Sequence, residues 1–419
     1  MTEFGFTRGH VGAGSGGRYA KRMPTLDYHT AGESHGPALI TLVQGLPAGV
    51  PLDVEFINAE LARRQGGYGR GGRQRIETDR AEFLSGVRLG RTIGSPLTIR
   101  LANKDSRLDD LERTPPVHRP RPGHADLAGS VKWLTTDCRE TLERASARET
   151  AARTAAGAVA RCLLRTIGVE VFGFVRRIHA AEWTPDVTIE NWRDRLKLRD
   201  ESDVYCPDPD VSQQMRKAVR TAKEEKDTVG GLVEVHVFGL PIGLGSSMDW
   251  RSKLDSRLAG AVMGVQAMKS VEIGLGKEVA ERFGSEVHDP IRYDEARRET
   301  PSLGFARDSN NAGGLEGGMT NGEPVVVRAA MKPISTLLRG LPSVDLNTKQ
   351  ASDSQYERSD VCAVSAASVV VENVVAFEIA RAALEKFGGD SLLEFTQNHE
   401  AFMEKARMLP LEPPGQALA

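Results

Sequence analysis

Apolar residues recur along this chain with two different periods. Short runs rich in branched and aromatic residues, which are typical of β-strands, occupy residues 39–43, 97–101, 169–174, 232–238 and 325–331. Two much longer alanine- and valine-rich segments open at Arg144 and Arg358, and their pattern predicts helices that end near Thr166 and Lys386. Because such strongly apolar helices need cover on several sides, we expect an α+β protein whose long helices are buried between sheets.

The two halves of the chain present these features in one order. Gly45-Leu-Pro-Ala-Gly49 and Gly239-Leu-Pro-Ile-Gly243 each follow a strand-like run. Each then leads into a helix-like pattern, at residues 54–64 and 254–268, and one of the two long helices closes each half. Turns and alanine-rich helices are common individually, but their shared order favours an internal duplication.

Composition excludes several classes of protein. The 419 residues include 40% hydrophobic residues, and 55 Lys and Arg face 57 Asp and Glu, which describes an ordinary globular chain and disfavours one that coats a polyanion. No apolar run approaches the roughly 18 residues of a membrane helix, since even 361–376 is interrupted by Glu372 and Asn373. We therefore expect no membrane contact.

Four cysteines, Cys138, Cys162, Cys206 and Cys362, stand far apart with no C-x-x-C pair. This spacing supports neither a zinc ribbon nor a dithiol redox site, and it fits a reducing cytoplasm. We expect no metal site.

Local composition predicts the domain boundaries. Residues 1–24 are rich in glycine and arginine and lack an apolar signal core, so we expect a flexible tail. A single domain is predicted for residues 25–398, with a polar surface excursion carrying helical pieces at about 186–226. Residues 399–419 are expected to form a C-terminal tail.

The segment from Leu61 to Arg75 carries five arginines and no acid, namely Arg63, Arg64, Arg70, Arg73 and Arg75. Five unpaired cations repel one another, and the planar guanidinium group suits carboxylate and phosphate, so a small polyanionic ligand would relieve the repulsion. A solvated basic loop explains the pattern equally well. An RNA-binding segment is less favoured, because only Tyr68 interleaves and the rest of the chain is not basic.

Two histidines lie in glycine-punctuated loops. His35 lies in Thr30-Ala-Gly-Glu-Ser-His-Gly36, and His124 closes Arg119-Pro-Arg-Pro-Gly-His124, where the prolines enforce extended backbone. A lone histidine is usually structural or merely exposed. Two of them among ionisable neighbours indicate a role in proton transfer, since histidine titrates nearest to neutrality.

Three further motifs suggest anion binding. Ser146-Ala-Arg-Glu149 has the form of a capping box, which would place Arg144 at the anion-attracting start of a helix. An arginine there is solvated, paired with Glu140 or Glu143, or facing a ligand. Residues 312–322 form a glycine-rich loop, and residues 331–336 add a lysine and two hydroxyls, which suits phosphate. The two G-x-G-x-x-G matches lack the strand and helix of a Rossmann fingerprint, and no P-loop motif occurs.

Taken together, seven motifs in sequence order resemble chorismate synthase. They are Thr30-Ala-Gly-Glu-Ser-His-Gly36, Gly67-Tyr-Gly-Arg-Gly71, Arg121-Pro-Gly-His-Ala-Asp126, Arg144-Ala-Ser-Ala-Arg-Glu-Thr150, Gly313-Gly-Leu-Glu-Gly-Gly-Met319, Met331-Lys-Pro-Ile-Ser-Thr336 and Arg358-Ser-Asp360. The resemblance runs from about Asp27 to Leu393. Two departures are a longer leading segment and Ser365, which stands where proline is expected.

The resemblance implies a carbon–oxygen lyase of the shikimate pathway to aromatic amino acids. Such an enzyme converts 5-enolpyruvylshikimate 3-phosphate to chorismate and phosphate by anti 1,4-elimination, and it requires reduced FMN although no net redox change occurs. It also implies a β-α-β sandwich, with long helices between two antiparallel sheets, assembled as a homotetramer. The flavin reductant is left open between an external flavin reductase and NADPH.

The resemblance also implies roles for individual residues. His35 would protonate the reduced flavin, His124 would assist departure of the phosphate, and Asp360 would help to remove the C6 proton. The substrate would be held by Ser34, Arg64, Arg70, Arg144 and Arg358. The flavin would contact Arg144, Ala145, Ser146, Gln266, Ala267, Gly317, Lys332, Pro333, Ile334, Ser335, Thr336 and Arg358. The alternatives are a nucleic-acid-binding protein and a different phosphate-ester enzyme on the same scaffold.

Overall fold

The structure, a computed structural model, describes residues 26–72, 76–355, 357 and 359–409. The predicted N-terminal tail, Arg73, Arg75 and Arg358 lie outside the described residues. Helices and strands alternate irregularly along the chain, so the predicted mixed class is confirmed.

The smaller of the two main sheets is built from the first quarter of the chain. Its four antiparallel strands lie in the order β1 (Asp27–Ala31), β2 (Ala38–Gln44), β6 (Leu97–Ala102) and β3 (Glu82–Ser85). Every second side chain of β2 and β6 is buried, which is the period-2 pattern of a sheet with one face against a core.

The larger sheet comes from the middle of the chain. Its order is β10 (Met268–Ile273), β15 (Val325–Met331), β9 (Gly231–Phe238), β7 (Glu170–Ile178) and β8 (Ala181–Glu182), and all its pairs are antiparallel. Side chains on both faces of β7 and β9 are buried, and most of them are apolar; Arg176, Glu234 and His236 are buried polar exceptions.

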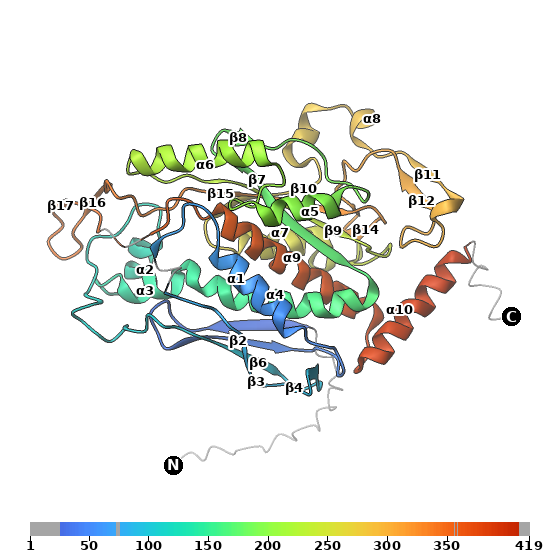
Figure 1. Ribbon diagram of the computed structural model, residues 1–419, viewed down its shortest axis with the longest axis horizontal. Coiled ribbons are helices and arrows are strands. Elements are labelled where there is room, and N and C mark those ends of the chain that lie inside the picture. Colours follow the sequence, from blue (N-terminus) through green and yellow to red (C-terminus); the bar gives the residue numbers. More distant parts are fainter. Residues whose placement is uncertain (1–25, 73–75, 356, 358, 410–419) are drawn as a thin grey trace, which may run out of the picture.

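Three helices lie between the two sheets (Figure 1). Helix α4 (Thr150–Leu164) packs on β2 and β6, whereas α9 (Val364–Phe387) packs on β7 and β9 and against α4. Helix α1 (Val54–Gln65) contacts both of them. Gly157 permits the close approach of α4 and α9, since a Cβ there would lie 2.1 Å from the carbonyl oxygen of Asn373.

Shorter elements surround this core. The polar excursion forms α5 (Trp192–Glu201) and α6 (Pro209–Glu224), which cover the outer side of the larger sheet. The remaining elements are α2 (Asp126–Trp133), α3 (Arg139–Ala145), α7 (Leu254–Met263), α8 (Gly284–Val287), α10 (Leu392–Arg407), β4 (Val87–Arg88), β5 (Arg91–Thr92), β11 (Ile291–Tyr293), β12 (Phe305–Arg307), β13 (Leu315–Glu316), β14 (Met319–Thr320), β16 (Pro342–Val344) and β17 (Ala351–Asp353).

Several predicted boundaries differ from the structure. The C-terminal boundary at residue 398 falls inside α10, whose start carries a capping box between Ser391 and Glu394. The helix expected at 254–268 ends at Met263, because the chain turns at Gly264 to enter β10. The helix expected to open at Arg144 is instead two helices separated by a short 3₁₀ turn after Ser146.

The four cysteines are buried and unpaired. Within the described part of the chain, no helix has the length and apolar character needed to cross a membrane.

Candidate active site

A cavity of about 470 Å³ lies where loops from both halves of the chain meet. It is lined by the α3–α4 junction, the loop after α1, and the segments 121–125 and 331–336. The structure brings together here most of the residues singled out from the sequence: Ser34, His35, Arg64, Arg70, His124, Ala145, Ser146, Gln266, Ala267, Lys332, Pro333, Ile334, Ser335, Thr336 and Asp360.

Two predicted site residues lie elsewhere. Arg144 is in the last turn of α3, not at a helix start, and its exposed guanidinium donates to the carbonyl oxygens of Thr30 and Gly32 at 2.9 and 3.1 Å. A cation at the end of a helix is stabilised by the helix dipole, which accounts for this position. Gly317 lies between β13 and β14 and does not line this cavity.

The expectation that the five arginines of residues 61–75 are unpaired is wrong for the three that the structure describes. Arg64 bonds to Asp79 at 2.9 Å, and Arg70 approaches Asp360 at 3.0 Å. Arg63 pairs with Glu372 in the middle of α9. Asp360 and Glu372 are distant in the sequence, whereas Asp79 and Glu60, which also pairs with Arg63 at 2.7 Å, lie just outside residues 61–75. A count of charges confined to that segment could not find any of them.

Arg64 nevertheless remains in an unfavourable environment for a cation. Only 3% of the residue is exposed, and burial together with the nearby charges of Arg148 and Arg70 lowers the pKa of Arg64 to about 10 despite the opposing effect of Asp79. The Nε atoms of Arg64 and Arg70 are buried and have no hydrogen-bond partner within the described chain. A bound anion would satisfy such groups.

Sequence reasoning missed two arginines that line the cavity. Arg148 donates to Asp79 at 2.7 Å and to Asn103 at 2.9 Å, and Arg121 donates to Asp126 at 2.8 Å and to Thr336 at 3.0 Å. Both belong to motifs quoted above. The sequence signal that could have found them is their position in these motifs: Arg148 lies two residues after Ser146, and Arg121 lies three residues before His124.

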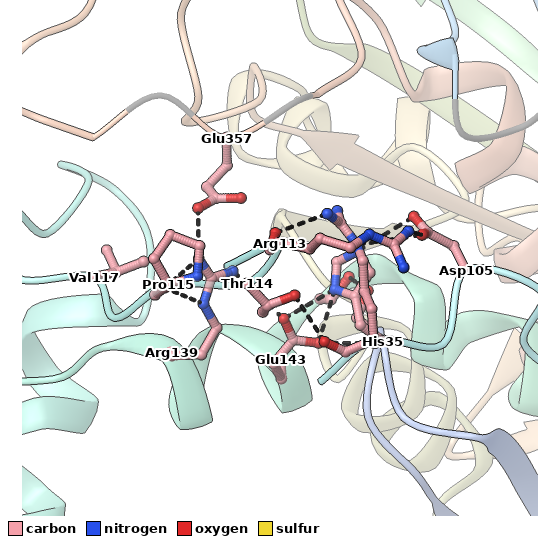
Figure 2. A network of polar contacts seen from close by, with 12 residues as sticks. His35, Asp105, Arg113, Thr114, Pro115, Val117, Arg139, Glu143 and Glu357 are labelled. Atoms are coloured by element: carbon pink, nitrogen blue, oxygen red, sulfur yellow. Dashed lines mark hydrogen bonds and ion pairs between the residues drawn. The ribbon is translucent and has the colours of Figure 1, made fainter. Parts of the chain in front are cut away.

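His35 lies on one side of the cavity, in the polar network shown in Figure 2. Its Nδ1 is 2.9 Å from Glu143 Oε1, and its backbone N–H donates to Glu143 Oε2 at 2.8 Å. Its Nε2 is 3.5 Å from Arg107 Nη2 and 3.7 Å from Asp105 Oδ2. This histidine therefore adjoins a guanidinium, a group suited to phosphate, which is itself paired with Asp105 at 3.2 Å.

His124 lies beside the segment 332–336. Its Nδ1 bonds to Asp126, whose carboxylate is fully buried and also accepts from Arg121. Hydrogen bonds from these two side chains outweigh burial and hold the pKa of Asp126 well below its usual range. Lys332 Nζ donates to the carbonyl oxygen of Gly123 at 2.6 Å, which ties this loop to the lysine motif.

One lining residue has a polar atom that is suited to a ring ligand. Gln266 donates through Nε2 to Glu149 at 3.0 Å, while its Oε1 is buried without a partner in the described chain. An N–H donor such as the imide of a flavin would satisfy that oxygen. The residues present therefore fit the flavin implied by the resemblance. No cluster of three or more His, Cys, Asp or Glu among the described residues could hold a metal ion.

Known proteins resemble this chain over most of its length. The chorismate synthase family model matches residues 26–384. Chorismate synthases of Desulforudis audaxviator and Geobacter sulfurreducens are each 52% identical over 394 residues, covering 91% of this chain and 98% and 99% of theirs. A crystal structure of chorismate synthase superposes with a TM-score of 0.75 at 38% identity, covering 92% of this chain and 99% of that one. The predicted enzyme class is confirmed: the chain belongs to the chorismate synthase family, carbon–oxygen lyases of the shikimate pathway.

Proposed function

We propose that this enzyme converts 5-enolpyruvylshikimate 3-phosphate to chorismate and phosphate by anti 1,4-elimination with reduced FMN bound. One observation carries the proposal: Arg64, Arg70, Arg121 and Arg148 converge on one cavity with two histidines. The substrate carries two carboxylates and a phosphate, so its charge complements this set of cations.

The substrate is held by guanidinium groups that are already oriented. Arg64 and Arg148 share the carboxylate of Asp79, which does not line the cavity, and Arg70 bonds to Asp360 at the cavity wall, so these two acids fix the directions of the three side chains. Preorganised cations can stabilise the charge that develops on the departing phosphate without rearranging in the reaction. Ser34, whose Oγ accepts from Ser146 at 3.1 Å, also lines the cavity.

The flavin would be held by Ala145, Ser146, Gln266, Ala267 and the segment 332–336, all of which line the cavity. Reduced FMN supplies reversible electron donation to the substrate. Burial and the nearby Lys269 lower the pKa of Lys332, so an anionic group bound beside this lysine would stabilise its charged form.

The contacts favour roles for the histidines opposite to those inferred from motif position. His35 adjoins Arg107, so we assign it as the acid that gives its Nε2 proton to the departing phosphate. His124 adjoins the segment 332–336 through Gly123 and Arg121, so it holds a proton on the flavin side of the cavity.

Asp360 is assigned the proton that leaves C6. Its Oδ1 accepts from the backbone N–H of Gly71 at 2.6 Å, and its Oδ2 faces Arg70. These contacts fix the carboxylate at the cavity wall, where it can accept a proton from a nearby carbon.

The finer architecture is also part of the proposal. Gly45 and Gly239 have φ of 82° and 78°, and Gly49 and Gly243 have φ of 93° and 90°, so the two Gly-Leu-Pro-x-Gly loops share positive backbone angles at equivalent glycines. This likeness supports a duplicated β-α-β sandwich. A homotetramer is the proposed assembly, to be measured by light scattering.

The test is anaerobic turnover of the purified enzyme with 5-enolpyruvylshikimate 3-phosphate and reduced FMN. We expect chorismate and phosphate in equal amounts, and no product when FMN stays oxidised. Parallel reactions with oxidised FMN and NADPH, with or without an external flavin reductase, identify the source of reducing equivalents. Absence of chorismate with fully reduced FMN would refute the proposed function.

A second test separates the two histidines. His35→Ala and His124→Ala should each slow phosphate release by about 10² to 10⁴-fold, which is the usual contribution of a positioned acid or base. Only the His124 variant should change the affinity for reduced FMN. A change in FMN affinity confined to the His35 variant would reverse the assignment.

A further inference from the structure

The carboxylate of Glu143 is fixed against the ring of His35. Glu143 is in α3, only 1% of it is exposed, and both of its oxygens face Nδ1 of His35, at 2.9 and 3.0 Å (Figure 2). Burial opposes its charge, but hydrogen bonds from His35 and the charge of Arg139 lower the pKa of Glu143 below its usual range. The group is therefore an ionised carboxylate.

An ionised carboxylate only accepts hydrogen bonds, so Nδ1 must carry a proton. The neutral ring then has its lone pair on Nε2, which faces Arg107 Nη2 at 3.5 Å. Asp105 lies 3.7 Å from the same nitrogen. Nε2 is therefore the nitrogen of His35 that can gain and lose a proton.

We propose that Glu143 is a positioning residue that keeps the Nδ1 proton on His35 and so reserves Nε2 for proton transfer. This rests on the proposed function, in which the imidazolium gives its Nε2 proton to the phosphate oxygen as the C–O bond breaks. The ring then returns to the neutral form with Nδ1–H still bonded to Glu143, and it recovers a proton at Nε2 before the next turnover.

Arg139 holds the carboxylate from behind. Its Nη1 lies 3.6 Å from Glu143 Oε1, and its other nitrogens donate to the Pro115 carbonyl oxygen and to Glu357 Oε1 at 3.0 Å. Figure 2 shows these groups forming one network with His35. Glu357 also lines the cavity, so the network reaches the cavity wall at a second residue besides His35.

Glu143→Gln is the informative variant, because an amide has one acceptor and one donor. The backbone N–H of His35 is an obligatory donor, so it takes the amide oxygen. The amide NH₂ then faces Nδ1, which must become an acceptor, and the ring proton moves to Nε2. Glu143→Asp keeps two acceptors and should keep the native tautomer.

The tautomer can be read directly by ¹⁵N NMR of histidine-labelled protein, with the His35 signals assigned by their loss in His35→Asn. Wild type and Glu143→Asp should show the Nδ1–H form, and Glu143→Gln the Nε2–H form. In chorismate formation, Glu143→Gln should lower kcat by about 10² to 10⁴-fold with little change in KM, and Glu143→Asp should recover part of the loss.

The control is Glu234→Gln. Glu234 is also buried and bonds to a histidine, His236 Nε2, at 2.7 Å, but neither residue lines the cavity. This variant should leave the His35 signals and kcat unchanged.

An unaltered His35 tautomer in folded Glu143→Gln would overturn the proposal, and so would a switched tautomer with wild-type kcat. If wild type forms no chorismate, the proposed function fails, while the NMR comparison still decides whether Glu143 sets the tautomer.

Discussion

Glu372 offers a quantitative test of how the core supports the cavity. It lies in the middle of α9 with no exposed surface, and its carboxylate meets Arg63, Arg161 at 3.2 Å and Arg199 at 3.5 Å. Arg63 immediately precedes Arg64 on α1. The cluster therefore anchors the end of α1, from which the arginine loop of the cavity departs.

Replacing Glu372 by Gln removes one negative charge while three guanidiniums remain. Glu60 is then the main remaining acid that balances the positive charge of the cluster, through its pairs with Arg63 and Arg161. Breaking a buried ion pair by removing one partner costs about 3–5 kcal/mol, because the remaining charge is desolvated without compensation. This is a large part of the roughly 5–15 kcal/mol that stabilises a typical folded protein.

The expected change in melting temperature follows from chain length. For 419 residues, an unfolding entropy of about 2.1 cal/mol/K per residue gives about 0.9 kcal/mol/K, so the variant should melt about 3–6 °C below wild type in scanning calorimetry. Glu385→Gln is the matched control on the same helix. Glu385 is 42% exposed and pairs with Arg257, so its loss should cost at most about 1 kcal/mol.

Two outcomes would refute this reasoning. The first is equal melting temperatures for Glu372→Gln and wild type, which would mean that the buried carboxylate contributes no net stability. The second is an equal loss in both variants, which would mean that burial does not govern the cost.

Two further predictions concern packing and pH. Gly157→Ala should lower the free energy of unfolding by about 1–3 kcal/mol in denaturant titration, because the new Cβ would clash with the backbone of Asn373. Gly260→Ala in α7 has open space around the new Cβ and should raise the free energy of unfolding by about 0.5–1 kcal/mol. Equal effects of the two substitutions would contradict the close packing of α4 and α9. Ion pairs and hydrogen bonds outweigh burial to lower the pKa of Glu60 and Glu234 from 4.5 to about 2, so their stabilisation is complete above about pH 4.5 and is lost as pH falls towards 2. Circular dichroism against pH should show this loss, and Glu234→Gln should reduce it.

The sequence pattern predicts the core elements well and their partners poorly. Strand-like runs at 39–43 and 232–238 lie within β2 and β9, because alternation and β-branching report local burial. The polar residues Glu372 and Asn373 in the apolar pattern of α9 are equally evident in the sequence, but their interaction partners are not. The acid pairs with Arg63, 309 positions away, and only the folded chain brings them together.

Near the cavity, an error of a few residues in a predicted helix boundary changes which side chains reach the site. Arg144 and Arg148 stand one helical turn apart in one motif, and the break after Ser146 sends Arg144 to the surface and Arg148 into the cavity wall. The sequence offers Glu143 only as a possible partner of Arg144, whereas in the structure it bonds to His35, 108 positions earlier, which no local pattern indicates. The capping box of Ser391 and Glu394, by contrast, can be recognised in the sequence and would have predicted the start of α10.

The pairing of the cavity arginines with acids explains how a cationic site can exist before its ligand binds. Asp79 lies between Arg64 and Arg148, and Asp126 holds Arg121, so repulsion among the cations is reduced during folding. The compensation is incomplete, since the pKa of Arg64 still falls to about 10. A ligand with several negative charges therefore gains from cations that are fixed in direction and short of counter-charge, whereas a neutral molecule of the same shape gains little. Selectivity for a polyanion thus follows from the placement of Asp79 and Asp126, which hold the guanidiniums but do not themselves line the cavity.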